Sequence, residues 1–224
     1  MFNFFKKSSP NIHSITLPNW GWVKETDNKS IRQWVNREET IVLVLHFFDL
    51  KPDIPTITNM DALRDFYRRG LLEVKGGVIE VEKTALAGGY SAIRSIFKFP
   101  QQPVGMAYLA SLTIPFDNYS YVIKIQAPEI GTTGIRDSLI FTEFLRNKKE
   151  PLNLEKPETM YQGWFQDPYD ASFQSPCLMN KSEDSLYDEQ FPDHPLSQVR
   201  KLLTQLESGL GFKAELEKVK PFSK

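Results

Sequence analysis

Four stretches of strand-forming residues with very short connections constrain the fold of this chain most strongly. They cover 78–84, 90–99, 104–114 and 119–127, and glycine or proline stands in each of the connections between them. Parallel strands need a crossover of about a dozen residues or more, so connections this short indicate antiparallel hairpins. The middle of the chain is therefore predicted to form an antiparallel meander.

Segments outside the meander predict one further strand and two helices beside the sheet. Residues 40–48 form an apolar, β-branched run of strand length, which is typical of a strand buried on both faces. A helix is expected from about Met60 to Gly70, and a second over 135–146, each with an apolar side that lies against the sheet. The predicted fold class is α+β: a mainly antiparallel sheet flanked by helices, as an α-β-α sandwich.

The 224 residues suffice for one large domain with an appendage. Residues 1–18 are expected to form a loosely held N-terminal arm, and 19–150 the α+β core domain. After residue 150 prolines recur and acidic and aromatic residues alternate, so 151–224 are predicted to be an irregular extension that wraps the core. A stripe of leucines and valine predicts that this extension contains a helix over about 195–208.

Charge and hydropathy exclude several classes of partner. Lysine and arginine number 27 against 28 aspartates and glutamates, so the chain lacks the positive surplus on which non-specific nucleic-acid binding depends. The most apolar stretch, 40–50, is interrupted by His46 and Asp49 and is shorter than the roughly 20 residues of a membrane-spanning helix. No secretory signal pattern is present at the N-terminus, and Cys177 has no second cysteine to pair with. A cytoplasmic protein is predicted, with neither nucleic acid nor membrane as a partner.

Residue patterns that carry catalysis or metal binding do not occur in the sequence. The three histidines lack metal-ligand spacing, Cys177 lacks a CxxC partner, and neither GxSxG nor a phosphate-binding glycine motif is found. The turn at 131–134 precedes a helix and could receive an anion, although a tight connection is the commoner role of such a turn. No catalytic residue, metal or cofactor is predicted, and an enzyme is not favoured.

The extension carries the most usable functional signal. Five carboxylates between residues 183 and 193 stand against the single Lys181, which suits a partner protein with a basic surface. Aromatic residues in the same segment could anchor an interface, since interface hot spots favour tryptophan and tyrosine, or could pin the extension to its own domain. The predicted protein-binding residues are Trp164, Tyr169, Tyr187, Asp184, Asp188 and Glu189.

The order of elements resembles the α-β-α sandwich of the PsbP family over about residues 15–147. The resemblance is carried by 108–117, which read YLASLTIPFD, and by 121–125, which read YVIKI and look like the paired central strands of that group. Known members mostly act as accessory subunits, cargo chaperones or partner-binding modules. The resemblance therefore implies a non-enzymatic binding fold, although a fold alone does not establish a function.

Two hypotheses follow from the sequence. The leading one is a non-enzymatic protein-binding or accessory module of a bacterial cytosol, of a chaperone, secretion-accessory or toxin-neutralising type, which uses the sheet face or the extension as its contact surface. An exposed sheet edge could also pair with a second copy to form a homodimer. The alternative is a small-ligand binder or hydrolase-like enzyme with a pocket near Trp20, Trp34 and His46.

Overall fold

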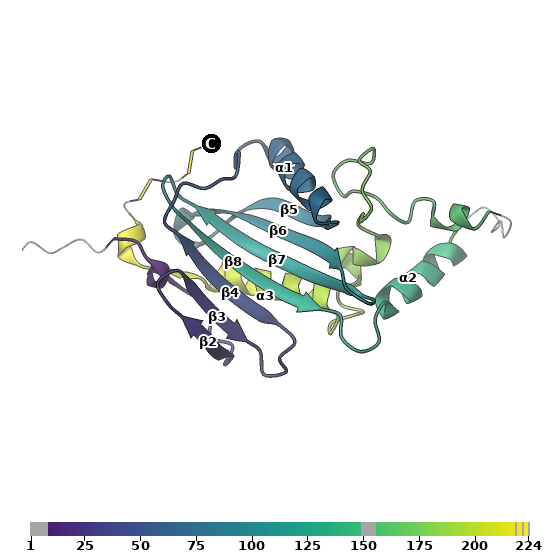
Figure 1. Ribbon diagram of the computed structural model, residues 1–224, viewed down its shortest axis with the longest axis horizontal. Helices are drawn as coiled ribbons and strands as arrows, with labels where there is room; N and C mark the ends of the chain where they lie inside the picture. The colour runs from purple at the N-terminus through teal and green to yellow at the C-terminus, as the bar shows by residue number, and fades with distance from the viewer. Residues whose placement is uncertain (1–8, 149–155, 218, 221, 224) are drawn as a thin grey trace, which may run out of the picture.

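The computed structural model describes residues 9–148, 156–217, 219–220 and 222–223. Its centre is a seven-stranded antiparallel sheet with the strand order β2-β3-β4-β8-β7-β6-β5 (Figure 1). The strands are β2 (Val23–Asp27), β3 (Ile31–Val35), β4 (Val42–Phe48), β5 (Gly77–Ala85), β6 (Ser91–Pro100), β7 (Met106–Pro115) and β8 (Ser120–Pro128). The helices are α1 (Met60–Glu73), α2 (Ile135–Arg146) and α3 (Pro195–Gly209). The predicted α+β class is confirmed.

The meander forms as the sequence predicts, and β4 joins it beside β8 rather than beside β5. A hairpin of β2 and β3, which the sequence analysis did not predict, extends the sheet beyond β4. Its turn forms because the Asn28 side chain accepts hydrogen bonds from the backbone N–H groups of Ser30 and Ile31.

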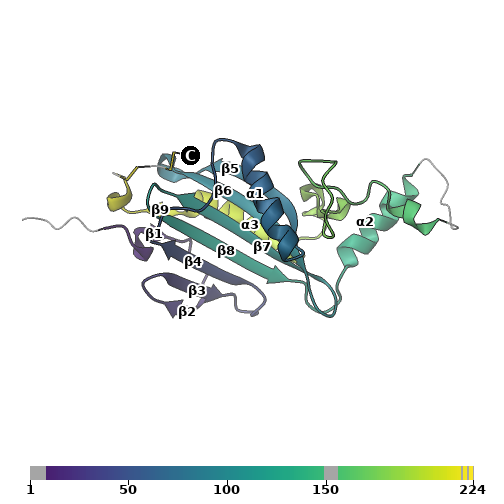
Figure 2. The ribbon, with the colours of Figure 1, turned by 45° about the horizontal axis from the view of Figure 1, so that its top comes forward.

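Each face of the sheet carries one helix (Figures 1 and 2). Helix α3 covers the centre of one face, where it packs on β7 and β8 and its Leu196, Val199 and Leu203 are fully buried. Helix α1 covers only the β5 end of the opposite face, and its buried side chains include Leu63 and Leu71. The sandwich is therefore lopsided, because one helix-bearing face is covered at its centre and the other only at its edge.

A bulge in β5 divides its apolar residues between the two faces. The register against β6 shifts between Val78 and Glu80, which leaves Ile79 without a partner. As a result Val78 and Val81 both pack under α1, whereas Ile79 packs in the core on the α3 side. Simple alternation would place Ile79 and Val81 on the same face.

Helix α2 has the predicted bounds but does not lie against the sheet, so that prediction is wrong. It projects beyond the strand ends and packs on the extension (Figure 1). Its Ile135 and Leu139 are 49% and 54% exposed. The side of α2 that does pack carries Phe141 and Phe144, and it contacts Trp164 of the segment 156–180 instead of the sheet.

Both ends of the described chain take part in the core. Ile12 and Ile15, expected in a loosely held arm, are 1% and 0% exposed. Strand β1 (Ile15–Thr16) pairs with β9 (Gly211–Phe212), and α3 supplies the main helix of the core. Between α2 and α3 the chain is irregular, with the short 3-10 turns η3 (Pro157–Tyr161), η4 (Lys181–Glu183) and η5 (Ser185–Tyr187). Over the described residues, no helix is long and apolar enough to cross a membrane.

Candidate functional site

Trp164, a predicted anchor for a partner, lies inside the protein. Its side chain is 4% exposed, and its ring centroid lies 4.8 Å from that of Phe141 and 5.3 Å from that of Phe144. These contacts fasten α2 to the extension. Tyr187 is half-buried in η5 and its backbone N–H bonds the carbonyl of Asp184.

The acidic residues of the extension are neutralised in part by the protein itself. The carboxylate of Asp188 pairs with Arg136 at 3.0 Å and with Arg200 at 2.9 Å. The carboxylate of Asp184 caps η5 by accepting a hydrogen bond from Leu186, and its side chain remains in solvent, as does that of Glu189. Asp184 and Glu189 are therefore the predicted acidic residues that a partner could reach.

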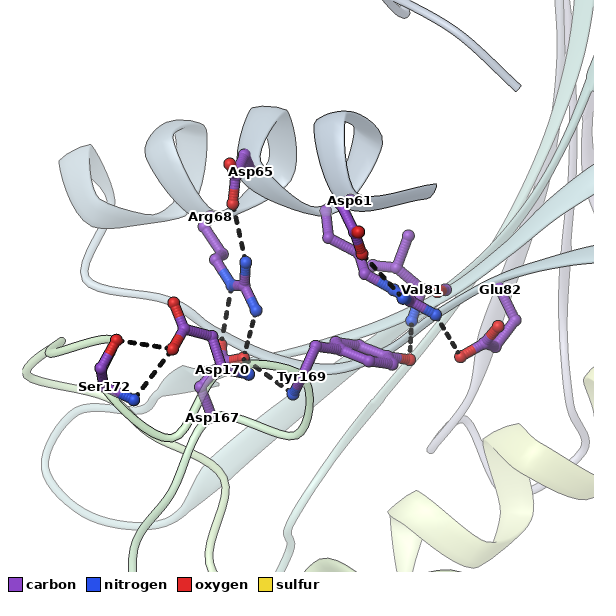
Figure 3. A network of polar contacts seen from close by, with 10 residues as sticks. Asp61, Asp65, Arg68, Val81, Glu82, Asp167, Tyr169, Asp170 and Ser172 are labelled. Carbon is purple, nitrogen blue, oxygen red and sulfur yellow. Dashed lines mark hydrogen bonds and ion pairs between the residues drawn. The ribbon is translucent and has the colours of Figure 1, made fainter. Parts of the chain in front are cut away.

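Tyr169 closes the β5 edge of the sheet (Figure 3). Its hydroxyl accepts a 2.7 Å hydrogen bond from the backbone N–H of Val81, and Arg64 donates to the Val81 carbonyl. Burial raises the pKa of Tyr169 to about 12, so the hydroxyl stays protonated. An unprotected edge strand invites pairing with another chain, and these side chains occupy the groups that such pairing would use.

A buried ion pair fastens the same segment to α1 (Figure 3). Arg68 and Asp167 are 6% and 3% exposed and are joined by two hydrogen bonds of 3.1 and 2.5 Å. The carboxylate of Asp167 also accepts the backbone N–H groups of Tyr169 and Asp170. The pKa of Arg68 is raised chiefly by its hydrogen bond to Asp167. Tyr169 and its neighbours therefore hold the extension in place.

A different surface is left open by the fold. On the face that carries α1, strands β3, β4 and β8 lie beyond the helix, and the connection 49–59 between β4 and α1 crosses the sheet at one end (Figure 2). The cross-strand register places the following side chains there, and we call them the uncovered face: Ile31 and Gln33 of β3, Val42, Val44 and His46 of β4, Val122, Lys124 and Gln126 of β8, and Leu109 of β7. All except the exposed Gln126 are half-buried.

The uncovered face combines apolar side chains with positive charge. Lys124 lies between Val44 and Ser111 in the register of the sheet, and His46 lies beside Val122. Desolvation, followed by the charge of Lys124, holds the pKa of His46 below its usual value of 6.5. The uncovered face itself contains no carboxylate, but at its border Glu25 of β2 accepts a 2.7 Å hydrogen bond from the side chain of Gln33.

A hollow beside α1 continues this surface. It has a volume of about 630 Å³ and lies between α1 and β6, where Phe66, Tyr67 and Phe97 contribute to its wall. Phe66 is 40% exposed, which is high for a phenylalanine. Arg64 and Arg68 point to the β5 side of the helix, so the hollow lies on the side toward the uncovered strands.

The residues of the alternative hypothesis are divided between the two faces. Trp20 and Trp34 line one cavity of about 280 Å³ on the α3 side, together with Leu43. His46 follows Leu45 on β4, and alternation along a strand turns it to the uncovered face. The predicted pocket exists without its histidine. In the part of the chain described by the structure, no group of three or more His, Cys, Asp or Glu side chains could hold a metal ion.

Comparisons with known proteins give weak likenesses. No family model and no curated protein matches the chain. A solved structure from Bacteroides thetaiotaomicron is 13% identical with a TM-score of 0.32, covering 64% of this chain and 51% of that one. A protein of unknown function from Pseudomonas aeruginosa is 9% identical with a TM-score of 0.30, and the match covers 62% of this chain and 85% of the Pseudomonas chain. This chain thus spans about half the length of the first structure. The PsbP resemblance stays a prediction.

The sequence analysis named a sheet face as a possible contact surface but did not predict which side chains form it. Alternation in β4 between Leu43 or Leu45 and Val44 or His46 is hidden, because all but the histidine are apolar. Arg32 was not connected with the tryptophans, since the β2–β3 hairpin was not recognised. The residues DNKS at 27–30 are a turn signal that could have revealed it.

Proposed function

We propose that this protein is a non-enzymatic binding module that holds a partner protein on its uncovered face, as an accessory or chaperone-type protein of a bacterial cytosol. One observation carries the proposal: strands β3, β4 and β8, together with Leu109 of β7, present a half-apolar surface that no helix of the described chain covers. A sheet face of this kind is normally packed against another layer, and exposed apolar patches mark interaction sites.

The chemistry of the face favours an apolar partner segment that carries acidic groups. Lys124 is the charged residue of the face, because the lowered pKa of His46 leaves its imidazole mainly neutral near pH 7, and a carboxylate of the partner beside Lys124 would meet positive charge. This differs from the basic partner that the extension suggested, because Asp188 of the extension is already paired with two arginines.

Pairing of two copies through their sheet edges receives less support. At one edge, Tyr169 and Arg64 occupy the backbone groups of Val81. At the other edge, β2 has a register shift after Lys24 and carries charged side chains, and both features discourage pairing. A hydrolase-like enzyme is not proposed, because its candidate base His46 lies on the opposite face from the tryptophan cavity.

Affinity capture with two matched variants tests the proposal. The face variant, Val44→Glu with Lys124→Glu, places negative charge on the uncovered face, whereas the extension variant, Asp184→Asn with Glu189→Gln, removes the two exposed extension charges. We expect a stoichiometric partner that the wild type and the extension variant retain and the face variant loses, with all three proteins melting cooperatively.

Loss of that partner from the extension variant, with capture kept by the face variant, would instead locate the contact on the extension. A second copy of the chain as the captured species, kept by both variants, would contradict the proposal and indicate a homodimer formed elsewhere.

A further inference from the structure

The cavity on the α3 side is walled by flat aromatic rings. Trp20, Trp22 and Trp34 line it, and the rings of the first two lie 5.5 Å apart between centroids. The Trp20 ring is held in place because its Nε1 donates a 2.8 Å hydrogen bond to Gln205 of α3. Rigid walls of this kind suit a flat apolar ligand, since aromatic rings stack with little loss of side-chain entropy.

Arg32 brings an unsatisfied hydrogen-bond donor, its Nε atom, to the same cavity. Its guanidinium lies over the Trp34 ring, 4.9 Å from the centroid, and its side chain is 16% exposed. The Nε atom is buried and has no hydrogen-bond partner, although Asp27 Oδ1 lies 3.3 Å away as an ion-pair contact. A guanidinium offers five N–H donors, and leaving buried donors unmet is unfavourable.

The local charge favours an anion at this position. Asp27 is shared, because its other carboxylate oxygen binds Lys24 Nζ at 2.8 Å. Two cations therefore stand against one carboxylate, which leaves a positive surplus beside the cavity. A carboxylate ligand would match the planar fork of Arg32 with two charge-assisted hydrogen bonds.

We propose that this cavity is a binding site for a small carboxylate with a flat apolar body, such as an arylcarboxylate. The body lies among the tryptophan rings and the carboxylate meets Arg32. The volume of about 280 Å³ is near the lower end of ligand pockets, so the ligand has one or two rings. The cavity and the uncovered face lie on opposite sides of the sheet, so this proposal and the proposed function stand or fall separately.

The indole N–H signals of nitrogen-15-labelled protein test the proposal directly. The chain has four tryptophans. Three line the cavity, and Trp164, which lies in the α2 cluster, serves as an internal control. We titrate with phenylacetate and with its neutral isostere phenylacetamide. Phenylacetate is expected to shift the signals of Trp22 and Trp34 in a saturable way and to leave Trp164 unmoved, and phenylacetamide to bind about tenfold more weakly or worse.

Two arginine variants complete the test. Arg32→Gln is expected to weaken phenylacetate binding by about tenfold or more, whereas Arg146→Gln, an exposed arginine at the end of α2, leaves it unchanged. If Arg32→Gln does not fold, Arg32→Lys keeps the charge without the fork and is expected to weaken binding. No saturable shift with phenylacetate, equal affinity for phenylacetamide, or unchanged affinity in the folded Arg32 variant would overturn the proposal.

Discussion

The buried ion pair of Lys98 and Glu183 predicts that the extension is an integral part of the fold. Nζ of Lys98 lies 2.7 Å from Oε2 of Glu183, and the two side chains are 2% and 1% exposed. The same carboxylate accepts hydrogen bonds from the Tyr108 hydroxyl and from the backbone N–H of Asn180. Burial, followed by the charge of Glu183, raises the pKa of Tyr108, so this hydroxyl remains a donor. Glu183 thus joins η4 to strands β6 and β7.

Replacing Glu183 with alanine leaves the Lys98 charge buried and unpaired and removes the acceptor of two further hydrogen bonds. Loss of one partner of a buried pair costs about 3–5 kcal/mol of the free energy of unfolding. For a chain of this length that loss corresponds to about 6–20 °C in Tm. Urea denaturation followed by circular dichroism, together with a thermal melt, measures both quantities.

Two comparisons separate the buried charge from a general effect of substitution. Asp61→Ala breaks a surface ion pair with Arg64. The Asp61 side chain is 94% exposed, so this substitution is expected to lower the free energy of unfolding by under about 1 kcal/mol. Replacing both partners, as Lys98→Met with Glu183→Leu, removes the unpaired charge and is expected to be more stable than Glu183→Ala. A Glu183→Ala protein that loses no more stability than Asp61→Ala would refute the docked arrangement of the extension.

Three further predictions concern the same framework. Trp164→Ala is expected to lose about 3–5 kcal/mol of stability in urea denaturation, because a buried aromatic side chain is removed; a melt like that of the wild type would contradict its buried position. Tyr169→Phe removes the acceptor for the Val81 N–H, so a loss of about 1–3 kcal/mol and faster hydrogen exchange at that amide are expected, and unchanged exchange would count against it. Burial acts to raise the pKa of Glu129, but hydrogen bonds from His194 and two backbone N–H groups hold it below the usual 4.5. The stability from Glu129 is therefore complete above about pH 4.5 and lost as the pH falls through the lowered pKa. Denaturation midpoints of the wild type and Glu129→Gln should converge on acidification, and a gap that persists would argue against the pKa shift.

The regular elements could be predicted because their signals are local. Short connections containing glycine or proline identified the β5–β8 meander, and the leucine stripe identified α3, which the sequence places at 195–208 and the structure at 195–209. Both depend on periodicity and turn residues within a few positions of each other. The bulge at Ile79 was not predictable in this way, because an extra residue in one strand leaves the apolar composition unchanged.

The positions of functional residues depended on contacts between distant segments. Asp188 seemed available in the sequence, but Arg136 and Arg200, which neutralise it, lie 52 and 12 positions away. Trp164 is buried by α2, and no local sequence pattern indicates that α2 packs on the extension and not on the sheet. The uncovered face likewise exists because α1 lies over the β5 end of the sheet and does not reach β8, and this placement is a property of tertiary packing.

Site-specific photo-crosslinking tests the central claim, that the uncovered face holds a partner protein. Benzoylphenylalanine is introduced singly at Gln126 on that face and at Glu189 on the extension, both of which are exposed. In intact cells that express the protein, illumination is expected to yield a discrete adduct with another protein from Gln126 and none from Glu189. A discrete adduct from Glu189 alone would contradict a contact on the uncovered face and would indicate that the partner binds the extension.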